Sequence, residues 1–322
     1  MTDLHYSGTL ISVVCFLAFL NVESQANDDA SKSEKEDEPF YSQLTRAIVR
    51  IEEHQSVCVP GLEWSVERDA PVGSAFFIRD SFENQVRFFI VTARHVVESR
   101  VDLFARVQSG PETTDQAILI LPRHLWAFHP QRALPDQFPI DVAVMRIPMR
   151  PFIKAFLNCP SGGESGECGK DENTEKPHLN QLVESPPVME RAMFFGFPGG
   201  DVAIKSVEPF ARAGVVAYTA PNPEFKIDGR LVAGDSVYFV DAPSFSGNSG
   251  GPVLREILPL RSGVFLLGLV TGSSRMGKDY AIVTRPEKIA ETLSHFRHSA
   301  ELSKEAWKTD PPSLPIKCAA EN

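Results

Sequence analysis

Hydrophobic residues recur along this 322-residue chain in short runs that polar turns separate. Short runs of apolar and β-branched residues between turn residues are typical of the strands of an all-β protein. They fall into two blocks, and we predict strands at 73–78, 87–92, 101–107, 116–121 and 141–147 in the first block and at 192–197, 202–218, 236–240, 252–257, 263–271 and 280–284 in the second. The pattern therefore predicts a pair of β-barrels.

Two stretches have helical spacing instead. Residues 40–53 place Leu44, Ile48 and Ile51 on one helical face, which predicts a short amphipathic helix. Residues 286–297 begin with a proline, which is favoured at the first position of a helix, and predict a second one.

The remaining segments are polar or irregular. The predicted organisation is a signal peptide (1–26), a disordered linker (27–39), one domain (40–297) with two barrel subdomains (about 65–150 and 188–285), and a polar tail (298–322). The connection between the subdomains, residues 149–187, is rich in Pro, Gly and Glu and has almost no periodicity.

The apolar run from Leu10 to Leu20 is too short to span a bilayer, which takes about 20 residues. It has the size of a signal-peptide core, and Ser24 and Ala26 supply small residues for cleavage, although residues 1–9 carry no Lys or Arg. We expect export to the periplasm or the medium, with no stable membrane span after cleavage. The alternative is a buried or anchoring N-terminal segment.

Four cysteines would remain after cleavage, and an even number in an exported protein permits disulfides. Cys159 and Cys168 bracket a flexible loop, so we favour that pair, which leaves Cys58 and Cys318 as the second. Three connectivities are possible, and in a reducing compartment all four would be free thiols.

Composition and charge exclude only a few classes of binding partner. The net charge of -10 and the pI of about 5.4 argue against nucleic acid or an anionic membrane. The cysteines and histidines do not have zinc-site spacing, so we expect no zinc site.

The chemistry concentrates in residues 246–253, which read SGNSGGPV. Here Ser249 lies between glycines on a tight turn that precedes an apolar strand. Glycines let the backbone bend sharply and let a substrate approach closely. Amide N–H groups beside such a serine are able to stabilise a developing oxyanion.

Two further residues complete an acyl-transfer set. His95 ends an apolar strand and Asp141 begins another, so the order along the chain is His, Asp, Ser with spacings of 46 and 108. Each alone has an ordinary structural interpretation: a surface histidine, a turn aspartate or a turn serine. The three together, in this order, predict a base, an orienting acid and a nucleophile.

The chain resembles the chymotrypsin-fold (trypsin-like) serine peptidases, and is closer to the bacterial Htr-like branch without a PDZ module. The matching motifs are GSAFFI (73–78), VTARHVV (91–97), DVAVMRI (141–147), GNSGGPV (247–253) and GLVTGSS (268–274). This resemblance implies two six-stranded antiparallel β-barrels, to which the helical patterns add short N- and C-terminal helices.

The resemblance also implies roles. Ser249 would be the nucleophile, His95 the general base and Asp141 its orienting acid. The N–H groups of Gly247 and Ser249 would form the oxyanion hole, and no metal or cofactor would be needed.

Substrate-binding residues follow by the same resemblance. They would be Pro243, Ser244 and Phe245 ahead of the serine turn and Val270, Thr271 and Gly272 on the cleft strand. With Pro243 at the base of the pocket, no acidic residue lies there, which favours a small or apolar substrate side chain. The alternative is an alignment shifted by two residues, which places Asp241 there instead.

The function expected is that of an exported serine endopeptidase that acts on proteins or peptides. The alternative is a protease-fold binding or scaffold protein with little turnover. An esterase shares the chemistry, but Ser249 precedes a strand and does not lie in a strand–helix elbow. The oligomeric state stays open.

Overall fold

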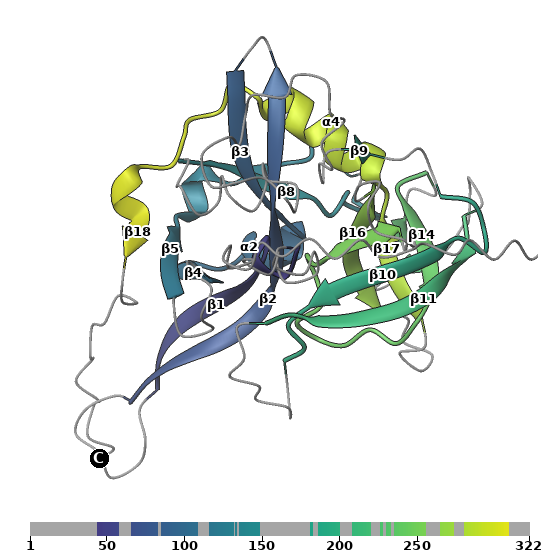
Figure 1. Cartoon of the computed structure of the whole chain (residues 1–322), viewed down its shortest axis with the longest axis horizontal. Coiled ribbons are helices and arrows are strands. Elements are labelled where there is room, and N and C mark those ends of the chain that lie inside the picture. Colours follow the sequence, from purple (N-terminus) through teal and green to yellow (C-terminus); the bar gives the residue numbers. More distant parts are fainter. Residues whose placement is uncertain are drawn as a thin grey trace, which may run out of the picture. The chain divides into compact units, whose positions relative to one another are not determined.

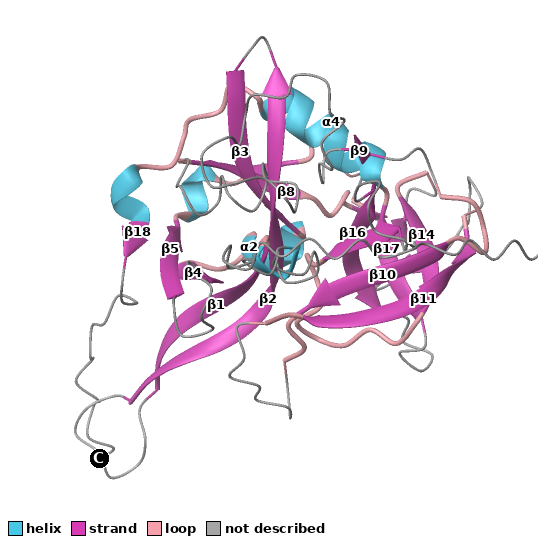
Figure 2. Cartoon of the chain, viewed as in Figure 1, coloured by secondary structure: helices cyan, strands magenta, loops and turns pink. Residues whose placement is uncertain are grey.

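Strands make up most of the regular structure in a computed structural model of the protein (Figures 1 and 2). It describes residues 44–57, 66–82, 85–108, 116–131, 133, 135–148, 181–182, 186–199, 208–219, 226–227, 230–232, 235–255, 265–273 and 280–308. The strands are β1 (Ile48–Val57), β2 (Val66–Phe82), β3 (Gln85–Thr92), β4 (Leu103–Gln108), β5 (Gln116–Leu121), β6 (Ala127–Phe128), β7 (Gln137–Phe138), β8 (Ala143–Ile147), β9 (Gln181–Leu182), β10 (Arg191–Gly196), β11 (Phe210–Tyr218), β12 (Lys226–Ile227), β13 (Arg230–Val232), β14 (Val237–Asp241), β15 (Pro252–Arg255), β16 (Phe265–Ser273), β17 (Tyr280–Thr284) and β18 (Trp307–Lys308). The helices are α2 (Arg94–Val97) and α4 (Pro286–Phe296), with 3-10 turns η1 (Arg123–Leu125) and η3 (Lys304–Ala306).

The second block of strands closes into a barrel. Its order is β15-β10-β11-β14-β17-β16, and β15 also pairs with β16, so the ring of six antiparallel strands is complete. A barrel of this kind leaves no unpaired edge.

The first block forms a curled sheet in the order β18-β5-β4-β1-β2-β3-β8-β6. Five of its six central strands correspond to strands predicted for the first barrel, and the sixth, β1, was not predicted as a strand. No described pairing joins β5 to β8. The hairpin of β2 and β3 ends at the pair Phe82 and Gln85. One closed barrel and one half-barrel sheet confirm the predicted all-β double-barrel fold class.

The predicted N-terminal helix at 40–53 is wrong from Ile48 onward, where β1 begins. Among the described residues of this stretch, 44–53, helical geometry is confined to Leu44–Arg46. Strand β1 lies inside the sheet, between β2 and β4, and Ile48, Val49 and Ile51 are all buried in the core cluster, at 2%, 1% and 0% exposure. Burial on both faces produces an apolar run without alternation, which resembles a helical pattern in the sequence alone.

The C-terminal part agrees better with expectation. The predicted second helix is α4, with its proline in the first turn and with Ile289 and Leu293 buried. Part of the predicted polar tail is not a free tail, because β18 pairs with β5 and Leu302 is buried.

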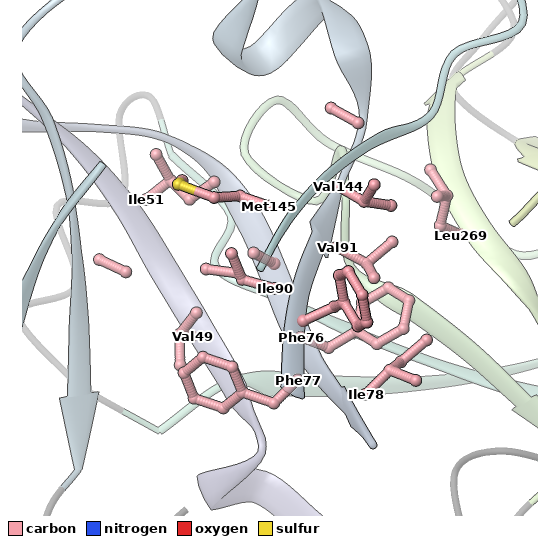
Figure 3. Close-up of a cluster of buried hydrophobic side chains, with 14 of the residues drawn as sticks. Val49, Ile51, Phe76, Phe77, Ile78, Ile90, Val91, Val144, Met145 and Leu269 are labelled. Carbon is pink, nitrogen blue, oxygen red and sulfur yellow. The ribbon is translucent and has the colours of Figure 1, made fainter. Parts of the chain in front are cut away.

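A single hydrophobic cluster extends from the first sheet into the second barrel. Figure 3 shows Phe76 of β2, Val91 of β3 and Val144 of β8 beside Leu269 of β16. All four side chains are fully buried. This shared core packs the two sheets against each other.

Several predictions fall outside the described residues. These are the signal peptide, the linker, most of the 149–187 connection and all four disulfide candidates. In the part of the chain that is described, no helix is long and apolar enough to cross a membrane.

A buried histidine ties helix α4 to the loop before β7. His129 Nδ1 accepts a hydrogen bond from the Gln131 N–H at 3.2 Å, and its Nε2 lies 3.0 Å from Glu291 Oε2. Since Nδ1 is an acceptor, the neutral ring donates through Nε2. Burial lowers the pKa of His129 below its ordinary value of 6.5, and the charge of Lys288 lowers it further. Glu291 and Asp235 act in the opposite direction but do not offset the effect of burial.

We therefore expect acid to destabilise the protein through this residue. A histidine whose pKa is lower in the folded state binds its proton mainly when unfolded, so stability falls as the pH drops through about 6.5. Urea unfolding at pH 7.5 and 5.5 should show a smaller pH difference for His129→Gln than for wild type. The exposed His124 provides the control His124→Gln, which should keep the full difference. An identical difference in all three proteins would contradict the prediction.

Candidate active site

His95 is presented by the one-turn helix α2, which starts two residues after β3 ends. The neighbouring Val96 and Val97 are fully buried and anchor the turn. The His95 side chain keeps 45% of its surface exposed, so its ring lies at the boundary between the core and solvent.

Asp141 lies beside this ring because of strand register. β8 pairs antiparallel with β3, with Ala143 opposite Thr92, so the residues just outside both strands approach each other. Asp141 Oδ2 lies 2.7 Å from His95 Nδ1, and Oδ1 accepts the backbone N–H of His95 at 2.9 Å. The carboxylate is 3% exposed. This pairing places the ring proton on Nδ1 and leaves the lone pair on Nε2.

The serine turn is built around two residues with left-handed backbones. Gly247 has φ +93° and Gly250 has φ +87°. A Cβ at Gly247 would lie 2.2 Å from the Phe197 carbonyl oxygen, and one at Gly250 would lie 2.1 Å from that of Ser74. Glycine is therefore required at both positions by backbone conformation and by space.

Hydrogen bonds on both sides hold the turn. The Asn248 N–H donates to the Phe245 carbonyl at 3.0 Å, and the Gly250 N–H donates to that of Val270 at 2.7 Å. The Ser249 carbonyl accepts the Ser74 N–H from β2 at 2.8 Å. Since β2 pairs with β3, this last bond brings Ser249 to the strand that leads to His95.

Gly250→Ala tests this turn, and we expect it to destabilise the fold strongly. The left-handed backbone costs roughly 1–3 kcal/mol for a non-glycine residue, and overpacking adds roughly as much. Chemical denaturation would measure the change in the free energy of unfolding. Gly272→Ala is the matched control, since no atom lies within 4 Å of a Cβ there, and should change it by less than about 1 kcal/mol. Equal effects of the two substitutions would contradict the prediction.

The peptide between Ser246 and Gly247 has a defined orientation. The Ser246 carbonyl accepts the Gly199 N–H at 2.7 Å. Because a trans peptide directs its N–H opposite to its C=O, the Gly247 N–H points away from Gly199. That amide is one of the two predicted oxyanion donors.

The predicted substrate-binding residues differ in their environments. Pro243 and Phe245 are exposed, whereas Ser244 is buried. Arg212 of β11 lies over the Phe245 ring, with its Cζ 4.3 Å from the centroid, and burial lowers the pKa of that guanidinium. Asp241, at the end of β14, is exposed.

On β16, which holds the other three predicted substrate-binding residues, Val270 and Thr271 are buried. Val270 has its side chain in the barrel core, and its N–H and C=O bond to Gly251 and Gly250. The Thr271 and Thr284 hydroxyls bond to each other. Gly272 alone of the three predicted residues faces open space.

The sequence reasoning missed Ser74, although it noted the surrounding motif. Its side chain is fully buried and bonds to the serine turn. A signal was present, because a polar residue within the apolar run GSAFFI needs a buried hydrogen-bond partner.

Within the described residues, no group of three or more His, Cys, Asp or Glu is arranged to hold a metal ion. The groups at this site that are able to carry chemistry are His95, Asp141, Ser249 and the backbone amides around them. A histidine fixed by a buried carboxylate and a serine between glycines are suited to nucleophilic acyl transfer.

No family model and no curated protein sequence matches the chain. Solved structures do match. The HtrA-type protease AlgW, solved with a decapeptide, is 13% identical, with a TM-score of 0.51 over 80% of this chain and 67% of AlgW. The active form of the M. tuberculosis protease Rv3671c is 18% identical, with a TM-score of 0.48 over 89% and 97% of the two chains. GrC is 14% identical, with a TM-score of 0.49 over 81% and 98%. The chain therefore shares the chymotrypsin-like double-barrel fold of the HtrA-type protease AlgW.

Proposed function

We propose that this protein is a serine endopeptidase that hydrolyses peptide bonds through Ser249, His95 and Asp141. The observation that carries the proposal is the Asp141 carboxylate, which bonds both the ring and the backbone N–H of His95. A buried acid that fixes the tautomer of a half-exposed histidine is the arrangement a general base needs.

In the proposed reaction, Ser249 Oγ attacks the scissile carbonyl carbon while His95 Nε2 accepts the hydroxyl proton. The tetrahedral oxyanion is bound by the N–H groups of Gly247 and Ser249. Collapse breaks the C–N bond, and the imidazolium gives its proton to the leaving amine. Water, deprotonated by His95, then hydrolyses the acyl-enzyme and regenerates Ser249.

The proposal includes the substrate class and the place of action. A small or apolar side chain would bind near Pro243, Phe245 and Gly272, none of which is acidic. AlgW was solved with a decapeptide. Because this chain shares the fold of AlgW, that complex supports a peptide substrate here by analogy. Export is proposed on the apolar run at residues 10–20.

A fluorophosphonate probe tests the proposal directly, because it reacts only with an activated serine. We expect native protein to be labelled, with the adduct on Ser249 by peptide mass mapping, and heat-unfolded protein to remain unlabelled. Casein and a peptide library should then be cleaved. Native protein that binds peptides without labelling or cleavage would overturn the proposal and favour a binding or scaffold role.

A further inference from the structure

The Ser74 hydroxyl connects the first sheet to both sides of the proposed oxyanion site. It donates a hydrogen bond to the Gly247 carbonyl at 2.7 Å and accepts the Phe197 N–H at 2.9 Å. A hydroxyl has one donor and two acceptor positions, so both bonds exist at once. The side chain is fully buried, which excludes water as a replacement partner.

These two bonds act on the two segments that orient the Gly247 amide. One fixes the carbonyl of Gly247 itself. The other holds Phe197, two residues before Gly199, whose N–H fixes the Ser246 carbonyl at 2.7 Å. The peptides before and after Gly247 are therefore both constrained, one through the 197–199 segment and one directly.

The backbone of Ser74 adds to the same connection. Its N–H donates to the Ser249 carbonyl, and its own carbonyl accepts the Thr92 hydroxyl at 2.7 Å. Space around the hydroxyl is limited, because a Cβ at Gly196 would lie 3.0 Å from it. Little room remains for the residue to adopt another rotamer.

We propose that Ser74 is a positioning residue for catalysis, whose hydroxyl holds the Gly247 N–H in the direction of the oxyanion. This inference rests on the proposed peptidase function. It means that Ser74, a residue of the first sheet, sets the orientation of a hydrogen-bond donor, the Gly247 N–H, that belongs to the second half of the chain. Ser74 contacts no substrate. Its effect is on the transition state, since an oxyanion donor acts most where negative charge develops.

The test is Ser74→Ala, compared by kinetics with wild type on a peptide that wild type cleaves. We expect kcat to fall by about 10- to 100-fold with KM within about 2-fold, because loosening a donor costs less than the 10²–10³-fold cost of removing one. The Ki of a matching peptide boronic acid should rise by a similar factor. Ser74→Thr, which keeps the hydroxyl, should recover most of kcat.

Active-site titration separates positioning from a purely structural role. Partial unfolding would lower the number of titrated sites and leave kcat per site unchanged. Tyr238→Phe is the matched control, because it deletes another buried hydroxyl donor, which bonds the Leu267 carbonyl at 3.1 Å. It should retain kcat per site. An unchanged kcat per site in Ser74→Ala would overturn the proposal.

Failure of the proposed function gives a different result. Wild type that neither labels nor cleaves would overturn the peptidase assignment without using any Ser74 variant. Amide hydrogen exchange then tests whether the Ser74 hydroxyl holds the neighbouring backbone in place, because its hydrogen bonds form without substrate. Exchange at Phe197 and Gly199 should be faster in Ser74→Ala than in wild type, and unchanged exchange would overturn the positioning role.

Discussion

Ser249→Ala is expected to lower kcat by roughly 10⁶-fold, the loss that follows when a catalytic serine is removed from a complete triad. The Ser249 backbone carbonyl accepts the Ser74 N–H of β2, and Gly247 and Gly250 on either side have left-handed backbones. The change removes one oxygen from a residue whose backbone carbonyl makes the structural bond, so the fold should persist. Hydrolysis of a fluorogenic peptide measures kcat, and thermal unfolding measures the fold.

Ser294→Ala is the matched control, since Ser294 is exposed on helix α4. It should leave both kcat and stability unchanged. If Ser249→Ala kept more than about 1% of wild-type activity, the nucleophile would have to be another residue.

Asp141→Asn is expected to lower kcat by about 10⁴-fold, through the tautomer of His95. Asp141 accepts two hydrogen bonds, one from the His95 backbone N–H and one from the ring. An asparagine has only one acceptor oxygen. Because the backbone N–H is always a donor, that oxygen must face it, and the amide NH₂ then faces Nδ1.

A ring that accepts at Nδ1 carries its proton on Nε2, and it has no lone pair there to receive the proton of Ser249. The ¹⁵N chemical shifts of the two ring nitrogens report this exchange of tautomers directly. Asp102→Asn is the matched control. It makes the same charge change at an exposed residue with φ +48°, a conformation that asparagine tolerates well. Equal kcat in Asp141→Asn and wild type would remove Asp141 from the mechanism.

Local chemistry and periodicity in the sequence predicted a large part of this fold. Strands 116–121 and 280–284 have the predicted bounds as β5 and β17. Helix α4 was predictable because proline favours the first turn and the apolar spacing that follows has a helical period. Such features depend on residues near one another in the chain.

The failures have a common cause in tertiary burial. β1 was predicted as a helix because Leu44, Ile48 and Ile51 have helical spacing. These residues and Val49 are buried in the core cluster that also contains Leu269 of the second barrel. That environment is created by pairing between segments far apart in the sequence, so a local pattern does not contain it.

The candidate site divides in the same way. The sequence alone selected the residues that we propose carry the chemistry, because a serine between glycines, a histidine at the end of a strand and an aspartate at the start of another are local patterns. Only the tertiary structure decided how they are held: the antiparallel register of β3 and β8 brings Asp141 to His95, and Ser74 reaches Gly247 across 173 residues of chain. Hydrogen bonds of this range form only once the sheets have packed, and for that reason the orientation of the Gly247 amide could not be predicted from the sequence.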